Sequence, residues 1–276
     1  MIDLHLHTNA SDGLLAPAEL VQRASAAGLS TIGITDHDTM AGVPAAQEAA
    51  RQAGVRVIPG IEITSVDNGR DVHILGYFLD GDSAPLAALL RNQRADRVRR
   101  VREMAQRLEH LGLAVDVDSL LDGAPAGSRS IGRPALADAL VAAGHAVDRN
   151  DAFARLLGRG RPAFVPRRGV SGATVIGVIH AAGGIASLAH PGVTGDDTLI
   201  PGLVAAGLDA LEVWHSDHTP DQQQHYAALA DRLGVARSGG SDYHGEGLHR
   251  ACQLGGVVLP PSELERLERR RQSPRQ

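Results

Sequence analysis

The sequence predicts an α/β fold, a barrel-like domain of parallel strands joined by helices and interrupted by a helical insertion. Strand and helix patterns alternate through the first third of the chain and again after residue 183, which is typical of parallel strands with helical crossovers. Between residues 80 and 161 the pattern is helical and gives no strong strand signal. The 276 residues suffice for one such barrel, and the 43% apolar content suffices for its core.

The first part of the barrel is expected in the first 80 residues. The predicted strands cover residues 2–6, 30–35, 55–63 and 71–78, and the predicted helices between them cover residues 17–27 and 43–53. The first helix has Pro17 in its first turn and ends at Gly28, and Gly54 ends the second. In the first strand, Ile2, Leu4 and Leu6 alternate with polar residues, which indicates one buried apolar face.

The middle of the chain is predicted as a long Arg-rich helix, followed by shorter helices and then by the remaining strands. The helices are expected at residues 86–111, 134–143 and 151–157, the later strands at 183–191, 208–214 and 234–242, and the helices between those strands at 199–206 and 221–233. We therefore expect a first barrel part at 1–85, a helical insertion at 86–163 that caps the substrate, and a second barrel part at 164–276.

Bulk properties narrow the class of protein. The net charge of −5 and the pI near 6.2 argue against a general nucleic-acid coat protein, which would be basic. The single cysteine, Cys252, cannot form a disulfide within a monomer, which favours a reducing compartment. No secretory signal and no apolar run of roughly 20 residues is visible. We expect a cytoplasmic protein with no membrane segment, and no stable protein partner is evident.

Metal-ligand residue types recur where the predicted strands end. In parallel α/β folds the βα loops gather at that edge and build the active site. The residues that follow this placement are His5, His7, Asp12, His37, Glu62, His190, Asp242 and His244. Asp36 directly precedes His37, and His73 sits on the fourth predicted strand.

The spacing of the first pair suits a metal ion. His5 and His7 point the same way from a strand and stand roughly 6.6 Å apart, so both imidazoles can lean onto one ion, while Asp12 can reach a second. A His/Asp/Glu set without cysteine suits Zn²⁺, Mn²⁺ or Fe²⁺. With His73 and without Asp36 there are nine candidate ligands, which exceed what one ion can use, so we expect two or three divalent ions that share a bridging carboxylate.

A single histidine on a strand is more often a packed or surface residue, and for His73 alone that interpretation is favoured. The whole set is different, because its members obey one placement rule. Five histidines break the rule, lie on predicted helices or surface loops and are assigned no role: His110, His145, His180, His225 and His249.

The motifs HLHTNASDG, TDHDT, GIEIT, SLAHP and GGSDYH resemble, in the same order, those of the PHP (polymerase and histidinol phosphatase) superfamily. The resemblance implies a distorted (β/α)7 barrel with a metal cluster at the carboxyl-end mouth. The insertion and the phrases SIGRP, GRGRPAFVP and EVWHSDHT resemble the branch of small phosphoesterases that act on nucleoside 3′,5′-bisphosphates. Some members of that branch also trim short RNA from its 5′ end.

Carried over by motif, the resemblance implies three ions, with Mn²⁺ favoured and Fe²⁺ or Zn²⁺ as alternatives. The implied ligands are His5, His7, Glu62 and Asp242 for the first ion, Asp12, His37 and His244 for the second, and the bridging Glu62 with His73 and His190 for the third. Asp36, counted with the catalytic residues, and Asp38 are then expected to orient ligands.

Arginines in the insertion are candidates for substrate binding. Arg133 of SIGRP and Arg161 of GRGRP bracket its second half, and a guanidinium fork suits phosphate oxygens. The alternative is a pair of surface arginines at turns. His215 and His218 follow the strand 208–214, and either could contact phosphate or give a proton to the leaving oxygen. His218 is favoured, because it matches the family's His-Thr phrase.

The predicted activity is metal-dependent hydrolysis of the 3′-phosphate of nucleoside 3′,5′-bisphosphates such as pAp, through a hydroxide that bridges two ions. One alternative is a 5′-3′ exoribonuclease on short 5′-phosphorylated RNA. Another, from a different class, is a non-catalytic metal-binding module. The partner is accordingly a small nucleotide or a short RNA.

Overall fold

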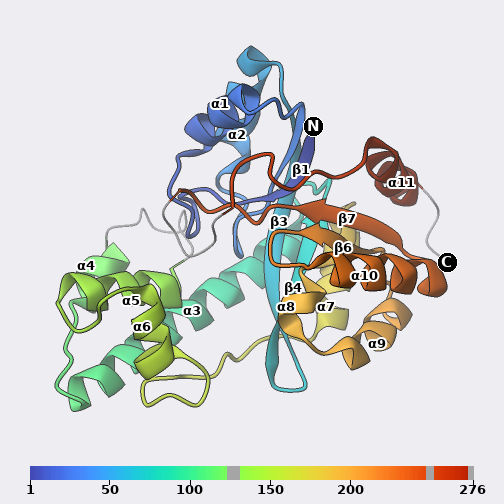
Figure 1. Ribbon diagram of the computed structural model, residues 1–276. Helices are drawn as coiled ribbons and strands as arrows, with labels where there is room; N and C mark the ends of the chain where they lie inside the picture. The colour runs from blue at the N-terminus through green and yellow to red at the C-terminus, as the bar shows by residue number, and fades with distance from the viewer. Residues whose placement is uncertain (123–130, 247–251, 273–276) are drawn as a thin grey trace.

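The computed structural model describes residues 1–122, 131–246 and 252–272. Its seven strands form one sheet in chain order (Figure 1). They are β1 (Ile2–Leu6), β2 (Thr31–Ile34), β3 (Arg56–Asp67), β4 (Arg70–Tyr77), β5 (Ile185–Leu188), β6 (Ala210–His215) and β7 (Ala236–Gly240). Leu6 bridges Tyr243, and the Asp242 N–H donates to the His5 carbonyl (2.8 Å). The sheet is thereby nearly closed, which confirms the distorted seven-stranded barrel.

The expectation of parallel strands throughout is wrong for β4. This strand runs antiparallel to both β3 and β5. Asp67 pairs with Arg70 across a two-residue loop in which Asn68 (φ 49°) and Gly69 (φ 69°) both have positive φ, the signature of a type I′ hairpin. A two-residue loop leaves no room for a crossover helix. Because β4 is reversed, its amino-terminal half lies at the mouth of the barrel.

Helices cover the outside of the sheet. They are α1 (Pro17–Ala26), α2 (Val43–Ala53), α7 (Gly172–Ala181), the short α8 (Pro191–Thr194), η2 (Asp197–Leu199) and α9 (Ile200–Ala205), α10 (Pro220–Leu233) and α11 (Pro261–Gln272). Ile2 and Leu4 belong to one apolar cluster with Leu264 and Leu267 of α11, whereas Leu6 belongs to the cluster formed with α1 and α2. Burying each such leucine contributes about 1.5–3 kcal/mol.

The chain between β4 and α7 forms a group of helices beside the barrel. These are α3 (Ala84–His110), α4 (Val117–Asp122), α5 (Arg133–Ala142), α6 (Arg149–Ala152) and the π-helical turn η1 (Phe153–Leu157). Figure 1 shows α3 running from the barrel into this group. The helices share their own apolar cluster, which includes Leu108, Leu136 and Leu157. Within the described residues, no helix has the length and apolar character needed to cross a membrane.

Barrel closure predicts the effect of one substitution. At Gly240 an added Cβ would stand 2.3 Å from the backbone nitrogen of His5, so Gly240→Ala must push β7 away from β1. We expect a loss of about 1–3 kcal/mol in the free energy of unfolding, measured by urea denaturation. The matched control is Gly177→Ala on the exposed side of α7, where nothing lies within 4 Å. The control should gain about 0.5–1 kcal/mol, and equal effects of the two changes would contradict the prediction.

Candidate metal centre

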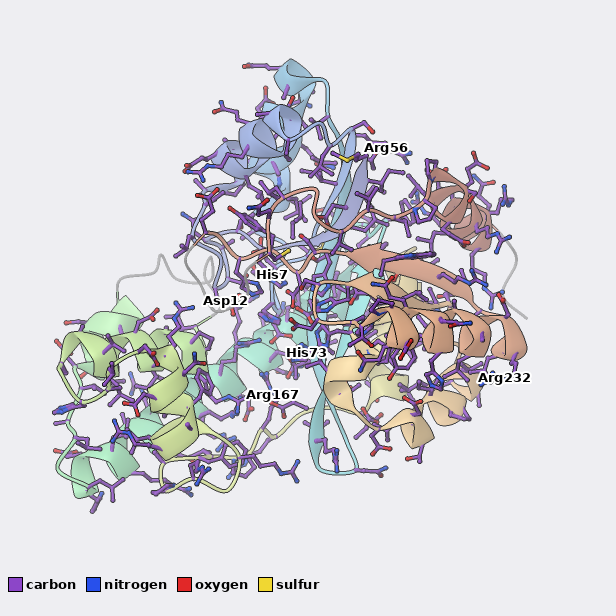
Figure 2. All side chains as sticks on the ribbon, in the orientation of Figure 1. His7, Asp12, Arg56, His73, Arg167 and Arg232 are labelled. Carbon is purple, nitrogen blue, oxygen red and sulfur yellow. The ribbon has the colours of Figure 1, made fainter. Side chains whose placement is uncertain are left out.

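The predicted ligands gather at the mouth of the barrel, on the side that faces helices α3 to α6. His5 in β1 and His7 directly after this strand are both buried, and Asp12 is carried by the loop that follows. In Figure 2 the labelled His7, Asp12 and His73 lie in the region between the barrel and the helical group. His73, which was expected on the strand itself, reaches this edge because β4 is reversed.

A first group of ligand atoms comes from β3 and from the ends of β1 and β7, where His7 directly follows β1 and Asp242 lies two residues after β7. His7 Nε2 lies 3.0 Å from Asp242 Oδ1 and 3.3 Å from Glu62 Oε2. His5 Nε2 lies 3.4 Å from each of the same two oxygens. One ligand atom from each of the four residues falls within 4.8 Å of all the others.

A second group forms around Asp12. Its Oδ1 lies 3.2 Å from His244 Nε2, and its Oδ2 lies 3.8 Å from His37 Nε2. His7 Nδ1 stands 3.8 Å from Asp12 Oδ1, so the His7 ring lies between the first group and the second.

Glu62 joins these groups to the remaining histidines. Its Oε1 lies 2.7 Å from His73 Nδ1 and 3.1 Å from His190 Nε2, and its Oε2 lies 3.0 Å from His37 Nδ1. With His5 and His7 this makes five imidazoles around one carboxylate. Glu62 is 1% exposed, in the middle of β3 and not at its end as the sequence suggested.

The donor atoms fit divalent metal ions. Buried atoms at the mouth have no hydrogen-bond partner among the described residues, namely His5 Nε2, His7 Nδ1 and Nε2, Asp12 Oδ1, His37 Nδ1, Glu62 Oε2 and His190 Nδ1. Leaving such groups unsatisfied is costly. Ligands about 2.1 Å from one ion stand about 3.0–3.4 Å from one another, which is the spacing of the first group. A bound cation would therefore satisfy these side chains better than hydrogen bonds among themselves do.

The electrostatics favour ligand forms that bind cations. Burial would raise the pKa of Glu62, but His37, His73 and His5 hold it well below its usual range. The pKa of Asp12 is likewise low, because His37 and His244 outweigh the effect of burial. Burial is the main cause of the lowered pKa of His37. The carboxyl groups of Glu62 and Asp12 are thus held ionised, and burial favours the neutral form of His37 that a metal ligand requires.

The backbone at the mouth is held in an unusual conformation. Of the five non-glycine residues with positive φ in the described part of the chain, three lie here: Asp38 (51°), His190 (28°) and Asp242 (54°). Such conformations persist only where surrounding contacts enforce them. The unfavourable backbone conformation at these three residues is therefore maintained by the contacts that position the ligands.

Two buried carboxylates hold ligands in place. Asp36 accepts hydrogen bonds from the Thr8 N–H (2.7 Å) and from the Thr8 and Ser11 hydroxyls (2.7 and 2.6 Å), which fixes the loop that carries Asp12. Glu212, which sequence reasoning missed, lies 2.9 Å from His5 Nδ1 and accepts from the His190 N–H (2.7 Å). Burial disfavours charge on His5, but Glu212 and Glu62 outweigh it and raise the His5 pKa. The only sequence signal for Glu212 is a carboxylate inside an apolar strand.

His215 and His218 are close to the centre, but their ring nitrogens are engaged. His218 Nδ1 donates to the Val213 carbonyl (2.8 Å), and its Nε2 accepts from the Gly192 N–H (3.1 Å). His215 Nδ1 accepts from the Asp217 N–H (3.1 Å), and its Nε2 lies 3.4 Å from Asp242 Oδ2. A proton donor needs a ring N–H aimed at the substrate. In this geometry His218 bonds to the loop after β5 and His215 contacts the ligand Asp242, while a role of either histidine in phosphate binding or proton transfer stays a prediction.

Two cavities meet at the ligand cluster. The first, of about 520 Å³, runs from the cluster to Pro134, Arg149 and Phe153 of the helical group. The second, of about 640 Å³, is lined by Arg70, Asp71, Arg133, Arg159 and Thr194. His73, His190 and Val193 line both.

The second cavity distinguishes the two predicted arginines. Arg133 lines it and lies between the rings of Phe153 and Phe164, 5.7 and 5.8 Å from their centroids. Arg161 is exposed and lines neither cavity. Arg159, two residues earlier, lines the second cavity. Arg70, Arg149 and Arg159 were missed, because nothing local in the sequence brings them to the mouth.

The histidines that were assigned no role bond away from the cluster. His110 lies 2.6 Å from the Gln106 carbonyl and His145 lies 3.1 Å from the Ala114 carbonyl, while His180 and His225 contact Asp209 and Asp197. His249 lies outside the described residues.

The role of Glu212 can be tested by Glu212→Gln, which removes the charge beside His5 and keeps the shape. We expect affinity for Mn²⁺, measured by titration calorimetry of the metal-free protein, to fall about 10–100-fold. The matched control is Asp209→Asn, because Asp209 forms a comparable buried contact with His180 (2.8 Å) far from the mouth. An affinity loss of similar size in both variants would argue against the proposed orientation of His5.

Comparisons with known proteins agree with this geometry. Residues 3–116 match the model of the PHP domain. The chain is 40% identical over 248 residues to a 5′-3′ exoribonuclease of Haemophilus influenzae (88% of this chain, 89% of that protein). It is 37% identical over 252 residues to a 3′,5′-nucleoside bisphosphate phosphatase of Chromobacterium violaceum (89% and 88%).

Among solved structures, a Bifidobacterium adolescentis protein assigned as a metal-dependent phosphoesterase superposes with a TM-score of 0.89 at 35% identity. That alignment covers 98% of this chain and 96% of the other. The resemblance drawn from the motifs is thereby confirmed, and the chain belongs to the PHP family of metal-dependent phosphoesterases.

Proposed function

We propose that the protein hydrolyses the 3′-phosphate of nucleoside 3′,5′-bisphosphates such as pAp. The observation that carries this proposal is the position of the ligand cluster, where a cavity walled by Phe153 and Pro134 meets a cavity lined by three arginines. A bisphosphate substrate needs a reacting phosphate at the cluster, a surface for its nucleoside and a cationic site for its other phosphate. The Chromobacterium violaceum relative named for this activity supports the assignment.

The nine predicted ligands are proposed to hold three divalent ions, with Mn²⁺ favoured. The first ion is assigned to His5, His7, Glu62 and Asp242, the second to Asp12, His37 and His244, and the third to Glu62, His73 and His190. Bound divalent ions supply the Lewis acidity and the activated water that phosphate-ester hydrolysis needs. The chain's own contribution is to hold the ligands in place, through Asp36 at the loop of Asp12 and through Glu212 at His5 and His190.

The helical insertion at residues 86–163 is proposed to act as the substrate cap, because it supplies one wall of each cavity. Arg133 is proposed to hold the second phosphate. Its guanidinium already contacts the rings of Phe153 and Phe164, so less further ordering is needed on binding. Phe153 also offers an apolar surface to the nucleoside. We also propose a cytoplasmic location, since the single cysteine suits a reducing compartment.

A second candidate activity is 5′-3′ exoribonuclease on short 5′-phosphorylated RNA. It is favoured by the exposed Arg70 and Arg159 in the second cavity, and by the exoribonuclease of Haemophilus influenzae among the relatives. Phosphate or nucleotide release from pAp, AMP, histidinol phosphate and a short 5′-phosphorylated RNA, measured with defined metals, separates the activities. Turnover of none of them would favour the non-catalytic module.

Removal of the metal or of a ligand should abolish hydrolysis of pAp. We expect loss of phosphate release on chelation and its return with Mn²⁺, and a decrease in kcat/KM of at least about 100-fold in Asp12→Asn and in His244→Ala. His145→Ala is the control, because His145 bonds to the Ala114 carbonyl within the helical group and should stay near the wild-type rate. Full activity in a metal-free sample would contradict the proposed function.

The two candidate arginines should differ in their effect on KM. Arg133→Ala removes a charged hydrogen-bond donor from the second cavity, so KM for pAp should rise about 10–100-fold. Arg161→Ala, at an exposed position outside both cavities, should change KM by less than about twofold. The kinetics are measured by phosphate release. A larger effect at Arg161 would show that the phosphate lies elsewhere.

A further inference from the structure

We propose that Arg97 of α3 is a positioning residue that joins the metal ligands to the substrate-binding segment. Its guanidinium contacts Asp38, next to the ligand His37, on one side and Gly132, next to Arg133, on the other. The assignment of those ligands and of Arg133 rests on the proposed function. The position of Arg97 between Asp38 and Gly132 does not rest on the proposed function, because it is given by contacts within the chain.

Asp38 is the contact point on the barrel side. Its side chain is completely buried, and its φ of 51° is uncommon for a residue other than glycine. The Asp38 N–H donates to the Glu62 carbonyl (2.9 Å), and Asp38 Oδ1 accepts from the Thr64 N–H (3.2 Å). Asp38 is therefore bonded to the backbone of Glu62 itself and of Thr64, two residues later, and it directly follows His37. A shift of this residue moves two proposed ligands.

Arg97 holds the other oxygen of that carboxylate. Its Nε and Nη2 each lie 2.6 Å from Asp38 Oδ2, and the Arg97 side chain is only 9% exposed. One turn earlier on α3, Gln93 donates to the Thr64 carbonyl (2.5 Å). Helix α3 is thus bonded at two successive turns, through Gln93 to the strand that carries Glu62 and through Arg97 to the residue that follows His37. With water excluded, these charged contacts are strong and sensitive to geometry.

On the substrate side, Arg97 lies against the start of α5. A Cβ at Gly132 would stand 2.8 Å from Arg97 Nη1, so the guanidinium occupies the place of a side chain there. A second path runs through Arg167, whose Nη1 lies 3.5 Å from Asp38 Oδ2 and whose Nε lies 3.8 Å from Asp71 Oδ2. The same Asp71 oxygen lies 3.5 Å from Arg133 Nη2. Both paths connect Asp38 to Arg133.

Attachment of α3 to the barrel does not require this pair. Leu86, Leu89 and Leu90 of α3 already lie in the main apolar cluster, together with residues of β3, β4 and α7. A buried ion pair is often no more stabilising than apolar residues of the same size, because two charges lose their hydration. The ion pair does provide a directional constraint. Here that constraint connects the metal ligands to the segment that carries Arg133.

The test compares Arg97→Met with Arg100→Met. Both changes remove a buried guanidinium from the same face of α3, but Arg100 bonds to Val165 and not to Asp38. For each variant we would measure the melting temperature, the affinity of the metal-free protein for Mn²⁺ by calorimetry, and kcat and KM for pAp. We expect Arg97→Met to weaken Mn²⁺ binding about 10–100-fold and to raise KM, as for other residues that orient ligands. Arg100→Met should lower the melting temperature only.

Arg97→Lys keeps the positive charge but loses the planar guanidinium group. This variant replaces Arg97→Met in the test if the Met variant does not fold. Its Mn²⁺ affinity should fall between those of the wild type and Arg97→Met. Wild-type Mn²⁺ affinity in both Arg97 variants, or an equal loss in Arg100→Met, would overturn the proposal. If the wild type hydrolyses no phosphate ester while Arg97→Met still weakens Mn²⁺ binding, the proposed function fails and the positioning role stands.

Discussion

The convergence of five imidazoles on the buried carboxylate of Glu62 is the constraint on which the rest of the structure depends. Such a cluster carries buried polar atoms that cannot satisfy one another by hydrogen bonding, so the surrounding fold must hold it in place. Asp36, Asp38 and Glu212 do this from different strands and loops. Strained backbone at Asp38, His190 and Asp242 belongs to the same arrangement.

The hairpin of β3 and β4 explains why the barrel is distorted and why the distortion is useful. Reversal of β4 brings His73 beside Thr64 and Glu62, which a strand parallel to β3 would not do. The reversal also places Arg70 and Asp71, at the start of β4, on the lining of the second cavity. The feature that departs from a regular barrel thus supplies one proposed ligand and part of the proposed substrate site.

The sequence predicted the barrel and the ligand cluster because both follow local rules. Alternation on β1 identified His5 and His7, and the loops after strands identified Asp12, His37, His190 and His244. The antiparallel β4 was missed although Asn68-Gly69 is a strong hairpin signal. Glu212, Arg97 and the difference between Arg159 and Arg161 could not be predicted, because contacts such as those to His5 and Asp38 join residues far apart in the chain.

A phosphatase and an exoribonuclease are both relatives of this chain, and the geometry explains how one centre could serve either. In both reactions the cluster would receive a phosphate ester, and the products differ only in what is attached beyond the reacting phosphorus. The barrel ligands cannot distinguish these substrates. Selection must therefore come from the cavity walls that the insertion and the β3–β4 hairpin provide. The buried contact of Arg97 with Asp38 is where that selecting surface is joined to the metal ligands.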